Sequence, residues 1–157
     1  MGNIIGITDE NRRAVSVELS KLLADEYVLY TKTRNAHWNV EGPDFHSMHV
    51  FFESQYDDLD EIMDEVAERI RKLDHYAPAT LKSFLELTHL TEKIGDKNNS
   101  LAYIKELLAD HESIIEFLRG SIDPFANKYH DLGTSDYITG LMETHEKMAW
   151  MLRAHLK

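Results

Sequence analysis

The sequence predicts an all-α protein, a four-helix bundle with a short extra helix in the crossover between helices two and three. Only 7 Gly and 3 Pro occur in 157 residues, and the long stretches between them repeat apolar residues at steps of three and four. No stretch shows the alternation of a strand. Four long amphipathic helices predict a bundle, which we treat as one domain over residues 1–157 with a short tail at 1–8.

The first helix is predicted over residues 9–37, and the breaker at 41–43 follows it. Thr8 is placed to cap its first turn, which carries Asp9 and Glu10. The residues that recur at helical spacing along one side of this helix are Val15, Leu19, Leu22, Leu23, Glu26, Tyr27 and Tyr30.

The second helix is predicted to open at Pro43 and Asp44 and to close between Asp74 and Pro78. Its apolar side is Phe45, Met48, Phe52, Leu59, Met63, Val66 and Ile70. A shorter helix is expected at about residues 80–87, within a connector that is long enough to cross the bundle.

The third helix is predicted to have Ser100 as its cap, with Leu101, Ile104, Leu107, Leu108, Ile114, Ile115 and Leu118 on its apolar side. It either runs past the Asp123-Pro124 step or kinks there, because proline breaks the hydrogen-bond ladder. The fourth helix is expected to start at Gly133-Thr134, and its core-facing side is Ile138, Leu141, Met142, His145, Met148, Ala149 and Leu152.

Composition narrows the possible functions. The absence of cysteine excludes disulfides, thiolate metal sites and a cysteine nucleophile. With 17 Lys and Arg against 28 Asp and Glu, the net charge of −11 disfavours nucleic acid and anionic membranes and favours cations. No segment approaches the roughly 20 apolar residues of a membrane span. The opening residues do not form a secretory signal, so we expect a cytoplasmic protein.

Four potential metal ligands lie along one stripe of the second helix: His49, Glu53, Asp64 and Glu68. Each i,i+4 pair can reach one ion. The eleven residues from Glu53 to Asp64, however, span roughly 16 Å, too far for a single site. If all four are ligands, they form two half-sites, and the simplest partner is the antiparallel second helix of a symmetry-related copy. His37, at the end of helix one, is placed to add an imidazole.

A simpler explanation stays open at this point. The same helix carries further acids, so that the stripe can equally be a solvated face: Asp57, Asp58, Asp60, Glu61 and Glu65. His37 taken alone is an ordinary helix-end histidine, and Trp38 taken alone is a packed aromatic residue.

These residues also carry a family signature, which comprises His37-Trp38-Asn39-Val40-x-Gly42-x-x-Phe45, then His49-x-x-Phe52-Glu53, then Asp64-Glu65-Val66-Ala67-Glu68-Arg69-Ile70. It closely resembles that of the Dps family, the mini-ferritins known as DNA-binding proteins from starved cells. The resemblance covers nearly the whole chain, and the spacing of 12, 4, 11 and 4 residues from His37 to Glu68 matches throughout.

The resemblance implies a ferritin-like bundle that assembles into a hollow homododecamer. It implies ferroxidase centres at two-fold interfaces, each expected to hold two iron ions, with His37, His49 and Glu53 of one subunit facing Asp64 and Glu68 of its neighbour. Such proteins oxidise Fe(II), typically with hydrogen peroxide and otherwise with dioxygen, store ferric oxyhydroxide and protect DNA. One departure is visible, because many members have Asp where this chain has Glu53.

The resemblance extends to three further residues. Trp38 matches an aromatic residue that lies beside the centre and serves as a radical sink. Asp136 matches an acidic position of the iron-entry pore, and Asp131 lies near one. Acids are also common at a helix N-terminus because they interact favourably with the helix dipole. This alternative stays open for both Asp131 and Asp136.

Three rival functions differ in what they require. An intramolecular di-iron bundle needs Glu-x-x-His on two helices, whereas the only match here is Glu86-x-x-His89 in the crossover. A DNA-compacting protein without essential ferroxidase activity would gain from a Lys-rich tail, but no Lys precedes Lys21 and the C-terminus stops at Lys157. We therefore do not expect tight DNA binding. A purely structural helical module would leave added iron in free solution.

Overall fold

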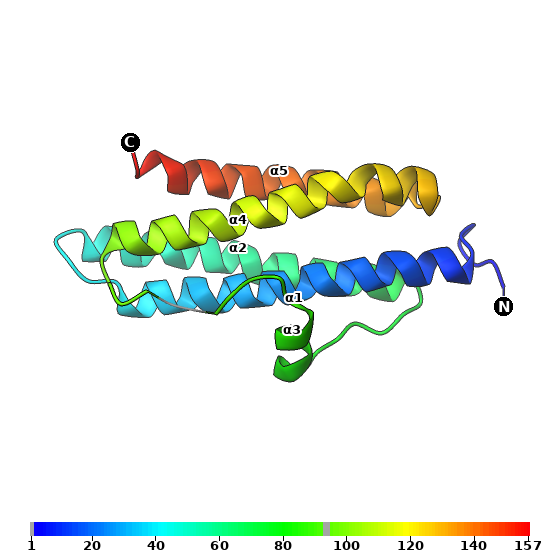
Figure 1. The fold of residues 1–157 in the computed structure, drawn as a ribbon, viewed down its shortest axis with the longest axis horizontal. Helices are drawn as coiled ribbons and strands as arrows, with labels where there is room; N and C mark the ends of the chain where they lie inside the picture. The colour runs from blue at the N-terminus through cyan, green and yellow to red at the C-terminus, as the bar shows by residue number, and fades with distance from the viewer. Residues whose placement is uncertain (1, 93–94) are drawn as a thin grey trace.

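The computed structural model describes residues 2–92 and 95–157, and this part of the chain is helical (Figure 1). Its helices are α1 (Asp9–Asn39), α2 (Phe45–Lys72), α3 (Leu81–Leu87), α4 (Ser100–Asp123) and α5 (Leu132–Ala154). One π-helical turn, η1 (Pro124–Lys128), follows α4. The β contacts among the described residues are two isolated bridges, Ile4 with Ile7 and Glu41 with Asn99. The all-α prediction is confirmed.

The helices form two antiparallel pairs, α1 with α2 and α4 with α5, stacked as two layers (Figure 1). The helices α2 and α4 start at the same end of the bundle. The connector between them therefore runs back along the whole length of the bundle. The short helix α3 lies on this connector, on the side of α1 away from α4 and α5 (Figure 1). The predicted bundle with a helix in its crossover is therefore present.

Local capping explains most of the helix boundaries. The Thr8 hydroxyl accepts a hydrogen bond from the N–H three residues on, at 3.2 Å, as predicted for α1. The cap predicted for α4 is wrong by one residue. The Asn99 side chain accepts the N–H bond three residues on, at 2.9 Å, and Ser100 donates to Asp44 at 2.5 Å instead. Ser100 thus ties the start of α4 to the start of α2.

The step at Pro124 continues as helix. The α4 helix runs into η1, where the N–H of Tyr129 donates to the Pro124 carbonyl at 3.0 Å. A π turn places the donor five residues on, which accommodates proline without a sharp break. Phe125 in this turn is buried, so the turn also extends the core.

The core is one apolar cluster along the bundle axis, and its largest fully buried side chains are Phe52, Phe125, Leu19, Leu22, Leu29, Leu59, Ile70, Leu73, Ile104, Leu107, Ile114 and Leu118. Most belong to the predicted apolar sides. Phe45 and Leu101 were predicted there too, but they are 44% and 48% exposed. Both lie in the first turn of their helices, where fewer neighbours cover them.

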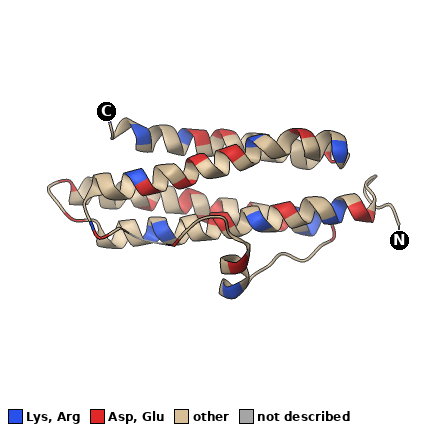
Figure 2. Cartoon of the chain, in the orientation of Figure 1, with Lys and Arg blue, Asp and Glu red and all other residues tan. Residues whose placement is uncertain are grey.

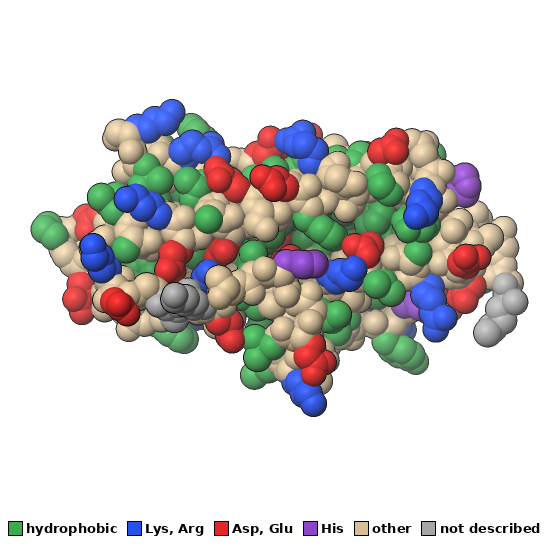
Figure 3. Space-filling model, in the orientation of Figure 1, with side chains coloured by type: hydrophobic (Ala, Val, Ile, Leu, Met, Phe, Trp, Pro, Cys, Tyr) green, Lys and Arg blue, Asp and Glu red, His purple; other side chains and the backbone are tan. Residues whose placement is uncertain are grey.

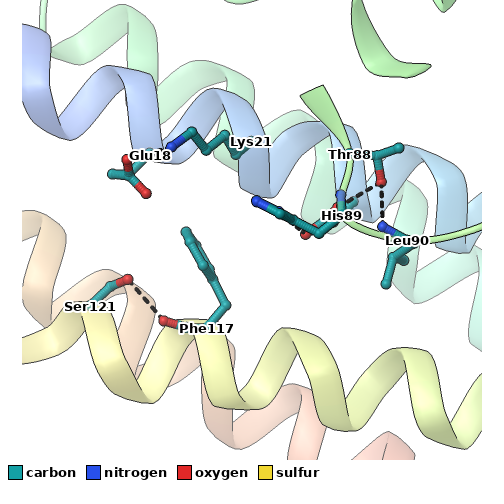
Figure 4. Close-up of polar contacts among 8 residues, drawn as sticks. Glu18, Lys21, Thr88, His89, Leu90, Phe117 and Ser121 are labelled. Carbon is teal, nitrogen blue, oxygen red and sulfur yellow. Dashed lines mark hydrogen bonds and ion pairs between the residues drawn. The ribbon is translucent and has the colours of Figure 1, made fainter. Parts of the chain in front are cut away.

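The crossover is anchored in the seam between α1 and α4. The buried carboxylate of Asp25 accepts hydrogen bonds from the Thr88 hydroxyl at 2.6 Å and from the His89 N–H at 2.7 Å. Figure 4 shows the His89 side chain extending between α1 and the ring of Phe117 on α4, at 6.3 Å between ring centroids. A single buried acid therefore fixes the segment that follows α3.

Charge is distributed over the whole bundle. Acidic and basic residues occur together along the long helices (Figure 2). On the face in Figure 3, Lys and Arg side chains are interspersed with acids and apolar groups, and those described there form no continuous basic patch. None of the helices in the described ranges has the length and apolar character needed to cross a membrane.

Candidate metal centre

The predicted ligands His37 and His49 meet where α1 ends and α2 begins. The turn between these helices includes Gly42, whose φ of +127° is rarely adopted by residues with a side chain. This turn brings the two imidazoles face to face, 3.8 Å between centroids and 14° between planes. Each ring's Nδ1 lies 2.7 Å from the other residue's backbone carbonyl oxygen.

The reciprocal bonds define what these rings offer to a metal ion. A carbonyl oxygen can only accept, so each Nδ1 of His37 and His49 must carry a proton and donate. In a neutral ring the opposite nitrogen, Nε2, then has a free lone pair. A ring held by its N–H to a backbone carbonyl is the usual support of a metal-binding histidine. Two imidazoles are therefore fixed in the metal-binding tautomer.

The carboxylates of the stripe lie on the surface of α2. Glu53 is exposed, one turn after His49, and Asp64 and Glu68 are exposed further along the helix. Because α2 is unbroken from Phe45 to Lys72, the two halves of the stripe are separated by roughly 16 Å along its axis.

The two halves therefore do not meet within one chain. Among residues 2–92 and 95–157, no three His, Asp or Glu side chains are grouped so that they could hold a metal ion. His37 and His49 lie together at one end of the stripe, and Asp64 and Glu68 form a second pair. A shared centre stays a prediction that requires a second copy.

An aromatic and cationic cluster lies beside the histidine pair. The Tyr56 ring lies edge-on to His37 at 5.1 Å, and its hydroxyl donates to Glu53 Oε1 at 3.5 Å. Burial, and secondarily the Glu53 charge, raises the pKa of the Tyr56 phenol. Trp38 is 66% exposed, with the Arg34 guanidinium 5.7 Å from its ring centroid. Sequence reasoning identified Trp38 but missed Tyr56.

The two predicted pore residues have different environments. Asp131 is 2% exposed, and its carboxylate accepts bonds from the Thr134 N–H at 2.9 Å and the Thr134 hydroxyl at 2.5 Å. Arg69 lies 3.5 Å from it as an ion-pair partner. Asp131 thus has the geometry of the α5 cap, which is the alternative left open above. Asp136 is exposed in the first turns of α5.

Sequence reasoning missed a polar chain in the centre of the bundle. Glu26, His145 and His111 come from α1, α5 and α4, and all three are fully buried. His145 Nε2 lies 2.6 Å from Glu26 Oε1, and the two Nδ1 atoms of His145 and His111 are 2.9 Å apart. The signal was present, because Glu26 and His145 occupy core-facing positions of the helical repeats.

The hydrogen bonds among Glu26, His145 and His111 constrain where the protons of the two imidazoles lie. The Glu26 carboxylate accepts from His145 Nε2, so in neutral rings His111 Nδ1 donates to His145 Nδ1. His111 Nε2 has no hydrogen-bond partner among the described residues. Burial, with the nearby His145 as the smaller cause, lowers the pKa of His111 well below its usual range. This ring is therefore neutral at physiological pH.

A buried ion pair includes Asp110, the residue that directly precedes His111 in the sequence. Lys32 Nζ is 2.6 Å from Asp110 Oδ2, and both side chains are at least nine-tenths buried. Burial raises the pKa of Asp110, while the hydrogen bond and charge of Lys32 act in the opposite direction. The pair joins α1 to α4.

Comparison with known proteins assigns the class. A family model of the ferritin-like domain matches residues 17–157, so the chain belongs to the ferritin-like family. DNA protection during starvation protein 2 of Bacillus anthracis is 35% identical to it over 147 residues, covering 93% of this chain and 98% of that protein. The Dps protein of Vibrio cholerae O1 superposes with a TM-score of 0.92 at 30% identity, covering 99% and 96% of the two chains. Within the ferritin-like family, this chain is a Dps protein, as its resemblance predicted.

Two further similarities agree with this assignment. A low temperature-induced protein of Nostoc sp. is 42% identical over 153 residues, covering 98% of this chain and 86% of that protein. The solved structure of Dps from Bacillus brevis has a TM-score of 0.88 at 30% identity, covering 94% and 98% of the chains. The V. cholerae protein is described as a member of a superfamily of ferritin-like diiron-carboxylate proteins.

Proposed function

We propose that the protein stores iron and detoxifies it by oxidising Fe(II) at centres shared between two copies of the chain. The observation that carries the proposal is the pair His37 and His49, each held through Nδ1 so that Nε2 is free. Imidazole and carboxylate together suit Fe(II). The Dps relatives and their diiron-carboxylate superfamily support a general role in iron storage and DNA protection.

In the proposed centre, His37, His49 and Glu53 of one copy bind iron opposite Asp64 and Glu68 of another, with two ions per centre. Two Fe(II) ions give up one electron each. One hydrogen peroxide accepts both electrons and two protons and becomes two water molecules, so no hydroxyl radical is released. Dioxygen is the alternative acceptor.

The assembly proposed for this chemistry is a hollow homododecamer that holds ferric oxyhydroxide. Asp136 is exposed and is the better placed of the two acids to line an entry pore, whereas the Asp131 carboxylate is engaged by Thr134 and Arg69. Negative charge at the surface would attract Fe(II). Trp38, which is largely exposed and follows His37 in the sequence, is proposed to take up stray oxidising equivalents.

Oxidation and storage can be tested together. Purified protein is mixed with Fe(II) and peroxide, ferric absorbance is followed, and the product is separated by size. We expect rapid oxidation and iron that elutes with a large shell. Iron left in free solution beside a monomer would refute the proposal.

Two sets of variants test the shared centre. Asp64→Ala with Glu68→Ala should abolish peroxide-driven oxidation and leave the fold intact. Asp60→Ala with Glu61→Ala removes the same charge from the same helix as a matched control. Mixed shells of His49→Ala and Glu68→Ala subunits should regain activity, because some two-fold sites would be complete. Inactive mixed shells would argue against sharing.

DNA protection is proposed to act through iron removal and not through tight binding. Twelve copies would carry a net charge of about −132, which repels the phosphate backbone. A gel-shift assay with plasmid at physiological salt should show free DNA. Retained plasmid would favour the alternative, a nucleoid-associated DNA-compacting protein.

A further inference from the structure

We infer that Tyr56 is a positioning residue that restrains the Glu53 carboxylate through its hydroxyl, and that Arg34 fixes the tyrosine in this role. The inference rests on the proposed function, because it concerns the same centre. It adds two residues that the stripe of ligands does not contain.

The Tyr56 ring is held on several sides. It is 7% exposed. His37 lies edge-on at 5.1 Å between centroids, Tyr30 lies at 6.0 Å with its plane at 82°, and the Arg34 guanidinium covers the ring at 4.2 Å from its centroid. A ring packed in this way has little freedom to rotate, so the direction of its hydroxyl is set by the core and not by solvent.

Arg34 is itself fixed. Its Nε donates to the hydroxyl of Tyr30 at 2.9 Å, one turn earlier on α1. The guanidinium plane therefore stays over Tyr56, where a cation is attracted to the aromatic face. The positive charge above the ring also favours donation by the phenol hydroxyl.

The hydroxyl of Tyr56 is directed at one ligand. It donates to Glu53 Oε1 at 3.5 Å, a long bond between residues at i and i+3 of α2. Glu53 is exposed and has three rotatable side-chain bonds, so it needs a partner to favour one direction. The Tyr56 ring also contacts His37, so one residue touches both a candidate carboxylate ligand and a candidate imidazole ligand.

The contact depends on the length of the Glu53 side chain. An aspartate at this position would draw the carboxylate back by one methylene and away from Tyr56. The length of the glutamate is therefore matched to the tyrosine three residues on. The two residues should be energetically coupled, whereas a tyrosine with only a packing role would not be coupled to the carboxylate length.

A double-mutant cycle tests this coupling. Fe(II) affinity is measured anaerobically by calorimetry, and the initial oxidation rate is measured against Fe(II) concentration. Tyr56→Phe should weaken Fe(II) binding and raise KM by about two- to tenfold, the range expected for loss of one hydrogen bond. kcat should change by less than about twofold, because the group acts before the electron-transfer step. In a Glu53→Asp background, Tyr56→Phe should have no further effect.

Tyr27→Phe is the matched control, since its ring stacks on Phe84 at 4.5 Å, on the side of α1 that faces α3. It should leave affinity and KM unchanged. Equal Fe(II) affinity in wild type and Tyr56→Phe, or the same loss in both Glu53 and Glu53→Asp backgrounds, would overturn the inference. Wild-type protein that neither binds nor oxidises Fe(II) would instead refute the proposed function itself.

Discussion

His111 should make the stability of the bundle depend on pH. Its ring is fully buried in the chain that links Glu26, His145 and His111, and burial lowers its pKa well below the usual 6.5. The native protein therefore resists the proton that the unfolded chain accepts. The groups that face this ring are His145 on α5 and, through it, Glu26 on α1.

The sign and size of the change in unfolding free energy with pH follow from proton linkage. Above about pH 6.5 the ring is neutral in both states and costs nothing. Below that pH the unfolded chain binds one more proton than the native protein, so the free energy of unfolding falls as the pH falls. The slope approaches about 1.4 kcal/mol per pH unit, and about 1.4 kcal/mol is lost between pH 7.5 and 5.5.

Urea denaturation at fixed protein concentration measures this loss, and fixed concentration matters because assembly contributes to stability. His111→Asn keeps a polar group near His145 but cannot bind the proton. The free energy of unfolding of this variant should therefore change between pH 7.5 and 5.5 by much less than the roughly 1.4 kcal/mol expected from His111 in the wild type. His46→Asn, at an exposed histidine, should retain the full difference. Identical pH dependence in wild type and His111→Asn would refute the reasoning.

Two other predictions concern buried charges. Lys32→Met should lower the free energy of unfolding by about 3–5 kcal/mol, because it leaves Asp110 buried without its partner. Lys21→Met, at a half-exposed pair, should cost at most about 1 kcal/mol, and comparable losses in denaturant would contradict the argument. Asp131→Ala should cost about 1–2 kcal/mol through loss of the α5 cap. Asp136→Ala should change the free energy of unfolding by no more than about 0.5 kcal/mol but slow Fe(II) oxidation; thermal melts and oxidation rates separate the two residues.

The helices could be predicted because their signals are local. Thr8 and the following acids define the start of α1, and the breaker at 41–43 separates it from α2. Where two capping residues adjoin, the local signal is ambiguous. Asn99 caps α4 because Ser100 bonds to Asp44, a residue from another part of the chain.

The position of the candidate stripe on one helix could also be predicted, because its spacing along α2 is a property of one helix, while its binding of metal stays a prediction. The support of His37 by the backbone at His49 could not, since it depends on how two helices meet. The role proposed for Tyr56 could not be predicted for the same reason, because it depends on contacts with α1. Glu26 gave a readable signal, a carboxylate in an apolar repeat, but its partners lie more than eighty residues away.

His37 and His49 exchange hydrogen bonds with each other's backbone, so each imidazole is oriented without help from the other side chain, and the two rings share only their stacking. Truncating either side chain frees one carbonyl at the helix corner, but the surviving ring keeps its own acceptor, the backbone carbonyl of the truncated residue. A protein with only one of the two side chains should therefore still present one imidazole in the metal-binding tautomer and keep part of its metal affinity.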